Sequence, residues 1–209
     1  MTSYQDEQLE ALQMVRRYLK CLSPIELKQL KREMADYLDF RREVQSFLSD
    51  HFSSVCTLTC FHNRRSACCS REGIITFFAD VVINALVSDS ELLDQLETVL
   101  KVENTGYKCI YLGKNGCLWN IKPIVCEMFL CDVSQKEVFD STPHLKLKWD
   151  NLQACRKGFT WPDKPVLFDD LERRFIDAGH RSTLMYLHNT PGLLRIKKQW
   201  QQIKRSESS

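Results

Sequence analysis

The chain has 209 residues, 44% of them hydrophobic and 27% charged, a composition typical of soluble globular proteins that excludes a largely disordered chain. Its 29 basic and 27 acidic residues nearly balance, so the charge gives no indication of a nucleic acid, an acidic membrane or a polyanionic substrate as partner. The first ten residues are polar and acidic, and the apolar stretch 73–87 is shorter than the roughly 20 residues that a membrane span needs. We therefore expect a cytoplasmic protein.

Helices are expected in the first third of the chain. Leucine and valine recur at steps of three and four residues between Leu9 and Leu22, which is typical of one face of a helix. Ser23-Pro24 with Glu26 is a capping box, and it predicts a second helix from Pro24 to about Phe52 because no further glycine or proline interrupts that run.

The middle third is expected to contain a cysteine-rich loop, two helices and a hairpin. Residues 74–86 are apolar enough for a buried helix, and the run 88–91 (SDSE) offers a capping box for another helix that extends to about Val102. Asn115-Gly116 is a strong tight-turn signal, and it predicts a small β-hairpin within residues 107–119. That turn places Cys117 directly after it.

The last third is expected to begin irregularly, because Pro143, Pro162 and Pro165 favour loops or extended segments. A helix is predicted for residues 168–188, followed by a basic terminal helix over residues 192–204. The expected fold is mainly α-helical with one small β-hairpin and a loop-rich cysteine cluster. Residues 1–55, 56–131 and 132–209 are taken as N-terminal helices, a cysteine-cluster region and C-terminal helices, packed together as one domain.

Ten cysteines are the most unusual feature of the sequence, and eight of them lie within residues 56–131. In a reducing cytosol thiols stay free, and closely spaced cysteines more often bind metal than form disulfides. Cys21 and Cys155 stand alone, and we interpret them as small buried hydrophobic residues. The candidate metal ligands are Cys56, Cys60, Cys68, Cys69, Cys109, Cys117, Cys126 and Cys131.

Four thiolates complete a tetrahedral zinc site or anchor a cubane iron–sulfur cluster, so eight can serve one centre or two. The eight thiolates outnumber the four that one zinc ion needs, which slightly favours an iron–sulfur centre. The spacing does not match the radical-SAM loop, the bacterial ferredoxin run or paired zinc-ribbon knuckles.

The order of motifs resembles the zinc- or iron-chelating cysteine-cluster family of bacterial proteins (YkgJ-type, CxxCxxCC). The matching elements are Cys56-x3-Cys60, the Cys68-Cys69 doublet, residues 75–80 (ITFFAD), Cys109, residues 112–117 (LGKNGC) and residues 122–126 (KPIVC). The resemblance covers about residues 55–131, and the gap of seven residues before the doublet is longer than is usual in the family. It implies metal binding by the eight cysteines.

Other residues allow two interpretations each. Asp80 and Asn84, one turn apart in an apolar helix, can be buried groups that support the centre or the wet face of that helix. His62 can replace a thiolate ligand or be a solvated loop residue. Tyr107, Tyr111, Trp119 and Phe129 can shield a centre from water, although ordinary packing is favoured.

Three functions are compatible with these patterns, and whether the protein is an enzyme stays open. The leading hypothesis is a metal-binding protein with an iron–sulfur centre or zinc. The second is a cluster-containing enzyme such as a protein lysine N-methyltransferase, because one branch that resembles this domain is linked to lysine methylation; no Gly-x-Gly-x-x-Gly loop accompanies it. The third is a zinc-stabilised adaptor for nucleic acid or protein that uses the basic C-terminal end.

Overall fold

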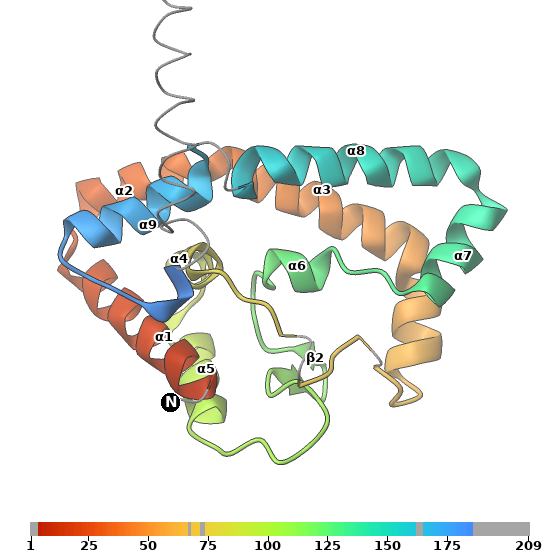
Figure 1. The fold of residues 1–209 in the computed structure, drawn as a ribbon, viewed down its shortest axis with the longest axis horizontal. Coiled ribbons are helices and arrows are strands. Elements are labelled where there is room, and N and C mark those ends of the chain that lie inside the picture. The colour runs from red at the N-terminus through yellow and green to blue at the C-terminus, as the bar shows by residue number, and fades with distance from the viewer. Residues whose placement is uncertain (1–3, 67, 72–73, 162–164, 186–209) are drawn as a thin grey trace, which may run out of the picture.

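The computed structural model describes residues 4–66, 68–71, 74–161 and 165–185 (Figure 1). The fold of these residues is mainly helical with one two-stranded antiparallel hairpin, as the sequence predicts. In chain order its elements are α1 Tyr4–Cys21, α2 Pro24–Glu33, α3 Ala35–Phe52, the π-helix η1 Ser53–Phe61, α4 Phe78–Val87, α5 Ser90–Leu100, β1 Leu112–Gly113, β2 Gly116–Cys117, α6 Ile124–Glu127, α7 Asp132–Ser141, α8 Pro143–Thr160, α9 Leu167–Asp177 and the 3-10 helix η2 Thr183–Met185.

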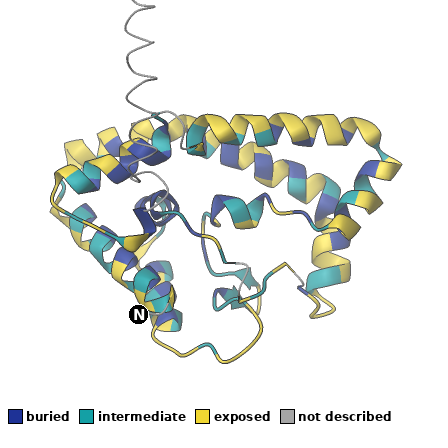
Figure 2. Cartoon of the chain, viewed as in Figure 1, coloured by how far each residue is buried: buried dark blue, intermediate teal, exposed yellow. Residues whose placement is uncertain are grey.

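Helix α4 is the centre of the helical frame. Every residue of α4 except Val87 is buried, and the helix packs against α1 and α9 (Figure 2). Phe78 of α4 meets Phe175 of α9 edge to face, with ring centroids 5.0 Å apart. Such a helix has no hydrophilic face, so apolar burial on all sides holds it in place.

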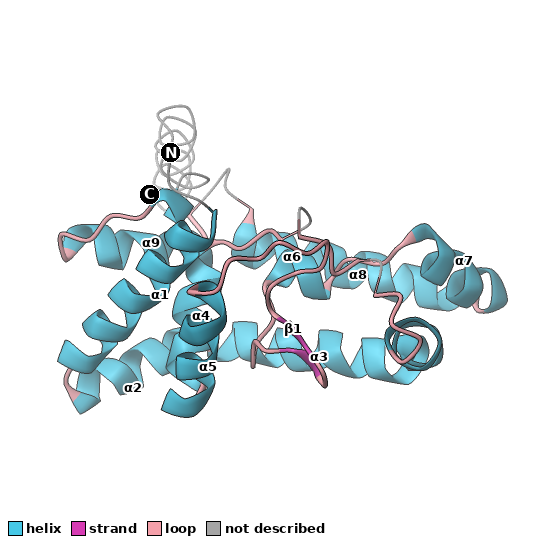
Figure 3. Cartoon of the chain, turned by 90° about the horizontal axis from the view of Figure 1, so that it is seen from below, coloured by secondary structure: helices cyan, strands magenta, loops and turns pink. Residues whose placement is uncertain are grey.

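Helix α3 extends the core away from α4 through a row of aromatic side chains. Phe40 stacks on Phe159 of α8, and further along the helix Phe47 stacks on Trp149 of α8 with ring centroids 5.5 Å apart. Offset and tilted aromatic pairs of this kind add to the free energy gained from apolar burial. The row therefore fixes α8 along α3, as Figures 1 and 3 show.

Several predicted helix boundaries are wrong. The single helix expected from Pro24 to about Phe52 is broken at Met34, which is fully buried and has φ −97° and ψ −1°. The buried helix expected to begin at Ile74 begins at Phe78, because the Asp80 carboxylate accepts a hydrogen bond from the Phe77 N–H at 3.0 Å and thereby caps the helix. The cap of α5 is Asp89 and not Ser88.

Two segments expected to be irregular are helical. The first cysteine pair lies on η1 and not in a loop, and residues 132–160 form α7 and α8. Pro143 occupies the first turn of α8, where its missing N–H breaks no hydrogen bond, so this proline begins a helix.

The helix expected over residues 168–188 ends at Asp177. Gly179 has φ +86°, and the N–H groups of Gly179 and His180 donate to the carbonyls of Ile176 and Phe175. This pairing is the usual end of a helix at a left-handed glycine. The predicted basic helix at residues 192–204 and Pro162 lie outside the described residues. Among the described helices, none combines the length and hydropathy that crossing a bilayer requires.

Candidate metal centre

The hairpin, α6 and the loops that carry the later cysteines lie between two groups of helices, with α1, α4 and α5 on one side and η1 and α7 on the other (Figures 1 and 3). The cysteine-bearing segments are mostly loops, because between Phe61 and Asp132 the cysteines outside β2 and α6 belong to no regular element. All eight predicted ligands have free thiols and are partly or largely exposed: Cys56 and Cys60 on η1, Cys68 and Cys69 in the following loop, Cys109 before β1, Cys117 in β2, Cys126 in α6 and Cys131 at the start of α7.

Backbone pairing places the doublet beside the segment that carries Cys109. The Cys109 N–H donates to the Cys69 carbonyl at 2.9 Å, and Ser70 and Lys108 form an isolated antiparallel bridge. The Arg71 N–H donates to the Tyr107 carbonyl at 2.9 Å. Residues 69–71 and 107–109 therefore run side by side, although nearly forty residues separate them in the sequence.

The hairpin then brings Cys117 to the same place. Leu112 pairs with Cys117 across the two strands, and the Leu112 N–H donates to the Cys109 carbonyl at 3.0 Å. Gly116 has φ +116°, a left-handed conformation that glycine adopts without strain, so the Asn115-Gly116 turn signal has a structural role.

The largest set of thiols that all interact with one another contains Cys69, Cys109, Cys117 and Cys126. Each of the six pairs among Cys69, Cys109, Cys117 and Cys126 interacts electrostatically. Burial raises the pKa of Cys109 to about 11, and it is the main cause of the raised pKa values of Cys117 and Cys126; the neighbouring thiols add to all three. Four acidic groups that disfavour one another's ionisation form a site where a bound cation would relieve the repulsion.

The remaining thiols lie around Cys56. Burial is the main cause of the raised pKa of this thiol, and Cys68, Cys131 and Cys60 raise it further. Ser134, which is only 1% exposed, hydrogen-bonds with Cys56 and accepts a bond from the Cys131 Sγ at 3.5 Å. One buried hydroxyl group of α7 thus joins a cysteine of η1 to Cys131, the residue just before α7.

The doublet links the two groups. A hydrogen bond between the two thiols raises the pKa of Cys68 and lowers that of Cys69, so the two adjacent side chains meet. Lys108 offsets part of the rise in the pKa of Cys68, and Lys122 offsets part of the rise in the pKa values of Cys117 and Cys126. These lysines offset part of the negative charge that thiolates would carry there.

In the part of the chain that the structure describes, no three cysteine, histidine, aspartate or glutamate side chains are arranged so that they could hold a metal ion. Electrostatic interaction between thiols extends over several ångströms, whereas a zinc–sulfur bond is about 2.3 Å long. The electrostatic interactions among these thiols make them neighbours but do not by themselves make them ligands of one ion. Cys21 and Cys155 are exposed, which corrects their interpretation as buried residues.

Three buried polar side chains hold the segment that carries Cys126. Asp80 Oδ1 accepts a hydrogen bond from the Ile124 N–H at 3.1 Å, and Asn84 Oδ1 accepts one from the Ile121 N–H at 2.9 Å. Both side chains are almost completely buried, which excludes the wet-face interpretation of this helix. The sequence left both interpretations open, and the structure places the two side chains in the core.

Arg41 of α3 is the third of these side chains, and no sequence pattern marks it. It forms an ion pair with Glu127, donates to the Lys122 carbonyl at 2.5 Å and donates to the Tyr37 hydroxyl at 2.8 Å. Buried charges are stable only when they are paired and hydrogen-bonded, and here the pairing fixes both ends of residues 122–127 to α3.

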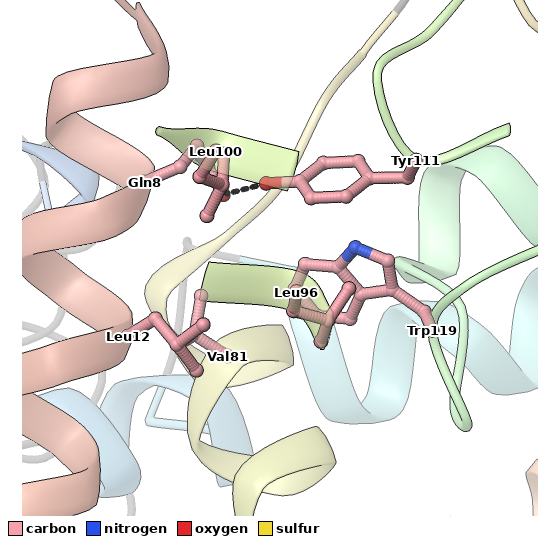
Figure 4. Close-up of a pocket in the computed structure, with 7 residues that line it drawn as sticks. All are labelled: Gln8, Leu12, Val81, Leu96, Leu100, Tyr111 and Trp119. Atoms are coloured by element: carbon pink, nitrogen blue, oxygen red, sulfur yellow. Dashed lines mark hydrogen bonds between the residues drawn. The ribbon is translucent and has the colours of Figure 1, made fainter. Parts of the chain in front are cut away.

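The aromatic residues near the cysteines fall into two classes. Tyr111 and Trp119 are buried and meet edge to face with ring centroids 5.5 Å apart, whereas Tyr107 and Phe129 are mostly exposed. Figure 4 shows the two buried rings beside Gln8 of α1, whose amide oxygen accepts a hydrogen bond from the Tyr111 hydroxyl at 3.4 Å. The buried pair anchors the hairpin to the helical frame, and exposed Tyr107 and Phe129 do not form a closed apolar shell. His62 is exposed.

A scan against protein-family models gave no match, and searches of curated proteins and of solved structures gave none either. The fold and the side-chain arrangement are therefore the basis for any assignment of function.

Proposed function

We propose that this protein binds metal through its clustered cysteines, as an iron–sulfur centre or as zinc. The observation that carries the proposal is that backbone hydrogen bonds and the hairpin place Cys69, Cys109 and Cys117 beside one another, with Cys126 in electrostatic interaction with all three. Four thiols that lie together repel one another once they are ionised, and a bound cation would neutralise the charge of the thiolates.

The donor set fits both kinds of centre. A four-thiolate site satisfies tetrahedral zinc and equally the four corners of a cubane cluster. Such a zinc site has no open position and supports folding, whereas a cluster supplies electron transfer. Because ligation requires thiolates, binding releases protons, and it weakens as pH falls because protons compete for Cys109, Cys117 and Cys126, whose pKa values are raised.

The motif order that resembles the zinc- or iron-chelating cysteine-cluster family supports the same proposal independently of the side-chain positions. The helical frame also supports it, because Asp80, Asn84 and Arg41 position the segment of Cys126 from three buried sites.

The test is purification of the full chain without oxygen, followed by absorbance spectroscopy and elemental analysis for iron and zinc. We expect bound metal in the wild-type protein and a large loss of it in the Cys109→Ser/Cys117→Ser variant. Visible absorbance with iron would identify a cluster, and a colourless protein with zinc would identify a structural site.

The matched control is Cys21→Ser/Cys155→Ser, which removes two thiols that lie on other helices away from the cluster. This control should keep the wild-type metal content. Equal metal loss in both double variants, or a metal-free wild-type protein, would contradict the proposal.

A further inference from the structure

We propose that a single buried water molecule joins helix α1 to the hairpin that carries Cys117, held between the side chains of Gln8, Tyr111 and Trp119. This inference concerns the attachment of the hairpin to the helical frame, and it does not depend on whether the cysteines bind metal. The site takes one small molecule that accepts two hydrogen bonds and donates one, a requirement that water meets.

Two buried N–H groups define the site. Among the described residues, neither Gln8 Nε2 of α1 nor Trp119 Nε1, which follows β2, has a hydrogen-bond partner. The two residues are only 1% and 6% exposed, so bulk water does not reach these donors. Buried polar groups almost always have a partner, and a donor left without one lowers stability. We therefore expect an acceptor within the core for both.

Gln8 and Trp119 line the same small cavity, and Tyr111 forms part of its wall (Figure 4). The centre of a water-sized sphere can occupy about 10 Å³ of this cavity, which is the room that one water molecule needs. The remaining lining side chains are apolar and supply no acceptor: Leu12, Val81, Leu96 and Leu100. The volume excludes a larger ligand, and the two N–H donors disfavour a cation.

The hydrogen bond between Gln8 and Tyr111 orients the site. The Tyr111 hydroxyl donates to Gln8 Oε1 at 3.4 Å, so the phenolic oxygen keeps its capacity to accept a hydrogen bond. Figure 4 shows the Tyr111 hydroxyl pointing at Gln8 and the indole nitrogen of Trp119 on the ring edge that faces Tyr111. A water molecule that accepts from Gln8 and Trp119 and donates to Tyr111 makes three hydrogen bonds, the usual number for a buried water.

The water would complete a row of polar contacts that α1 makes with the cysteine region. Gln5, one turn before Gln8, donates to the carbonyls of Leu100 and Val102 and accepts a hydrogen bond from the Asn104 N–H at 3.2 Å. Gln8 would continue this row to the base of the hairpin, because Tyr111 precedes β1 and Trp119 follows β2.

The test is NMR spectroscopy of water–protein contacts in the full-length chain purified without oxygen, with isotope-labelled tryptophan. We expect a nuclear Overhauser effect between the Trp119 indole proton and water, with the sign of a long-lived contact and assigned by its loss in Trp119→Phe. Gln8→Leu should abolish this effect while the indole signal itself remains. The matched control is Gln13→Leu, which removes a hydrogen bond to Glu97 from the same helix and should leave the effect unchanged.

A Trp119 indole proton without a contact to water would overturn the proposal, because its N–H would then point at the Tyr111 ring or at a rotated Gln8 amide. An effect that persists in Gln8→Leu would overturn it as well. If Gln8→Leu does not fold, Tyr111→Phe provides the same test: it removes only the hydroxyl and should weaken the contact, and an unchanged contact would contradict the site. The metal content of each sample is measured separately, so failure here leaves the proposed metal binding intact.

Discussion

At the residue scale, a few buried polar side chains connect the helical frame to the cysteines. The carboxamide oxygen of Asn84 accepts a hydrogen bond from the Ile121 N–H, and the carboxylate of Asp80 accepts one from the Ile124 N–H. Backbone groups of a loop that enters the core must find partners inside the protein, since water does not reach them. These oxygens are therefore needed for the loop to pass there.

Replacement of Asn84 by alanine should lower the free energy of unfolding by about 1–3 kcal/mol, because it leaves the Ile121 N–H without its acceptor. Urea unfolding followed by circular dichroism measures the change. The matched control is Asn120→Ala, which removes an exposed hydrogen bond to the Val87 carbonyl and should have a much smaller effect. Equal effects of the two substitutions would show that burial of Asn84 is not what matters.

Asp80 should make stability depend on pH. Burial raises the pKa of Asp80 from its ordinary value of 3.8 to about 7. Between about pH 4 and pH 7 the folded state therefore keeps a proton on Asp80 that the unfolded chain has lost. The free energy of unfolding should fall as pH rises through this range. We expect the stability of the wild type relative to Asp80→Asn to be greater at pH 5 than at pH 8 in urea titrations. A pH-independent difference between the two proteins would contradict this assignment.

At the element scale, capping decides where helices begin more than hydrophobic pattern does. The mostly apolar run begins at residue 74, yet α4 begins only at Phe78 because Asp80 caps it. Helix α5 begins after Asp89, whose carboxylate accepts a hydrogen bond from the Leu92 N–H at 2.8 Å. In the run 88–91 two residues of similar capping propensity stand side by side, so local sequence does not choose between them.

The substitution Asp89→Ala should lower stability by about 1 kcal/mol through loss of the α5 cap. Ser88→Ala should cost less, because the Ser88 hydroxyl makes only a 3.3 Å bond to Asn84. Thermal unfolding of both variants under the same conditions provides the comparison. A larger effect of Ser88→Ala would place the cap one residue earlier, where the sequence pattern had suggested it.

At the scale of the whole molecule, Arg41 joins the long helix α3 to the segment that carries Cys126. Its guanidinium group contacts Tyr37, Glu127 and the Lys122 carbonyl, and the ion pair with Glu127 is nearly inaccessible to solvent. The frame of helices and the cysteine region are thus connected by a buried charge, and not by apolar contacts alone.

Replacement of Arg41 by methionine should lower the free energy of unfolding by about 3–5 kcal/mol, because Glu127 would remain as an unpaired buried charge. It should also reduce metal retention by the purified chain. The double variant Arg41→Met/Glu127→Gln should recover part of the lost stability, since it removes the unpaired charge. Urea unfolding of Arg41→Met, Glu127→Gln and the double variant gives a double-mutant cycle. If the changes in the free energy of unfolding of the two single variants add up to that of the double variant, a direct interaction between Arg41 and Glu127 is contradicted.

The sequence by itself determined the fold class, α1, the capping box at Ser23, α5 and the hairpin at Asn115-Gly116, because these depend on periodicity and on local hydrogen bonds. It also marked Asp80 and Asn84, but without deciding whether they face the core. Only the tertiary structure decided that question, the burial of Met34, the role of Arg41 and the grouping of the cysteines. Those features depend on contacts between segments far apart in the chain. A local sequence pattern does not show which distant residue pairs with a buried charge, or which thiols lie together.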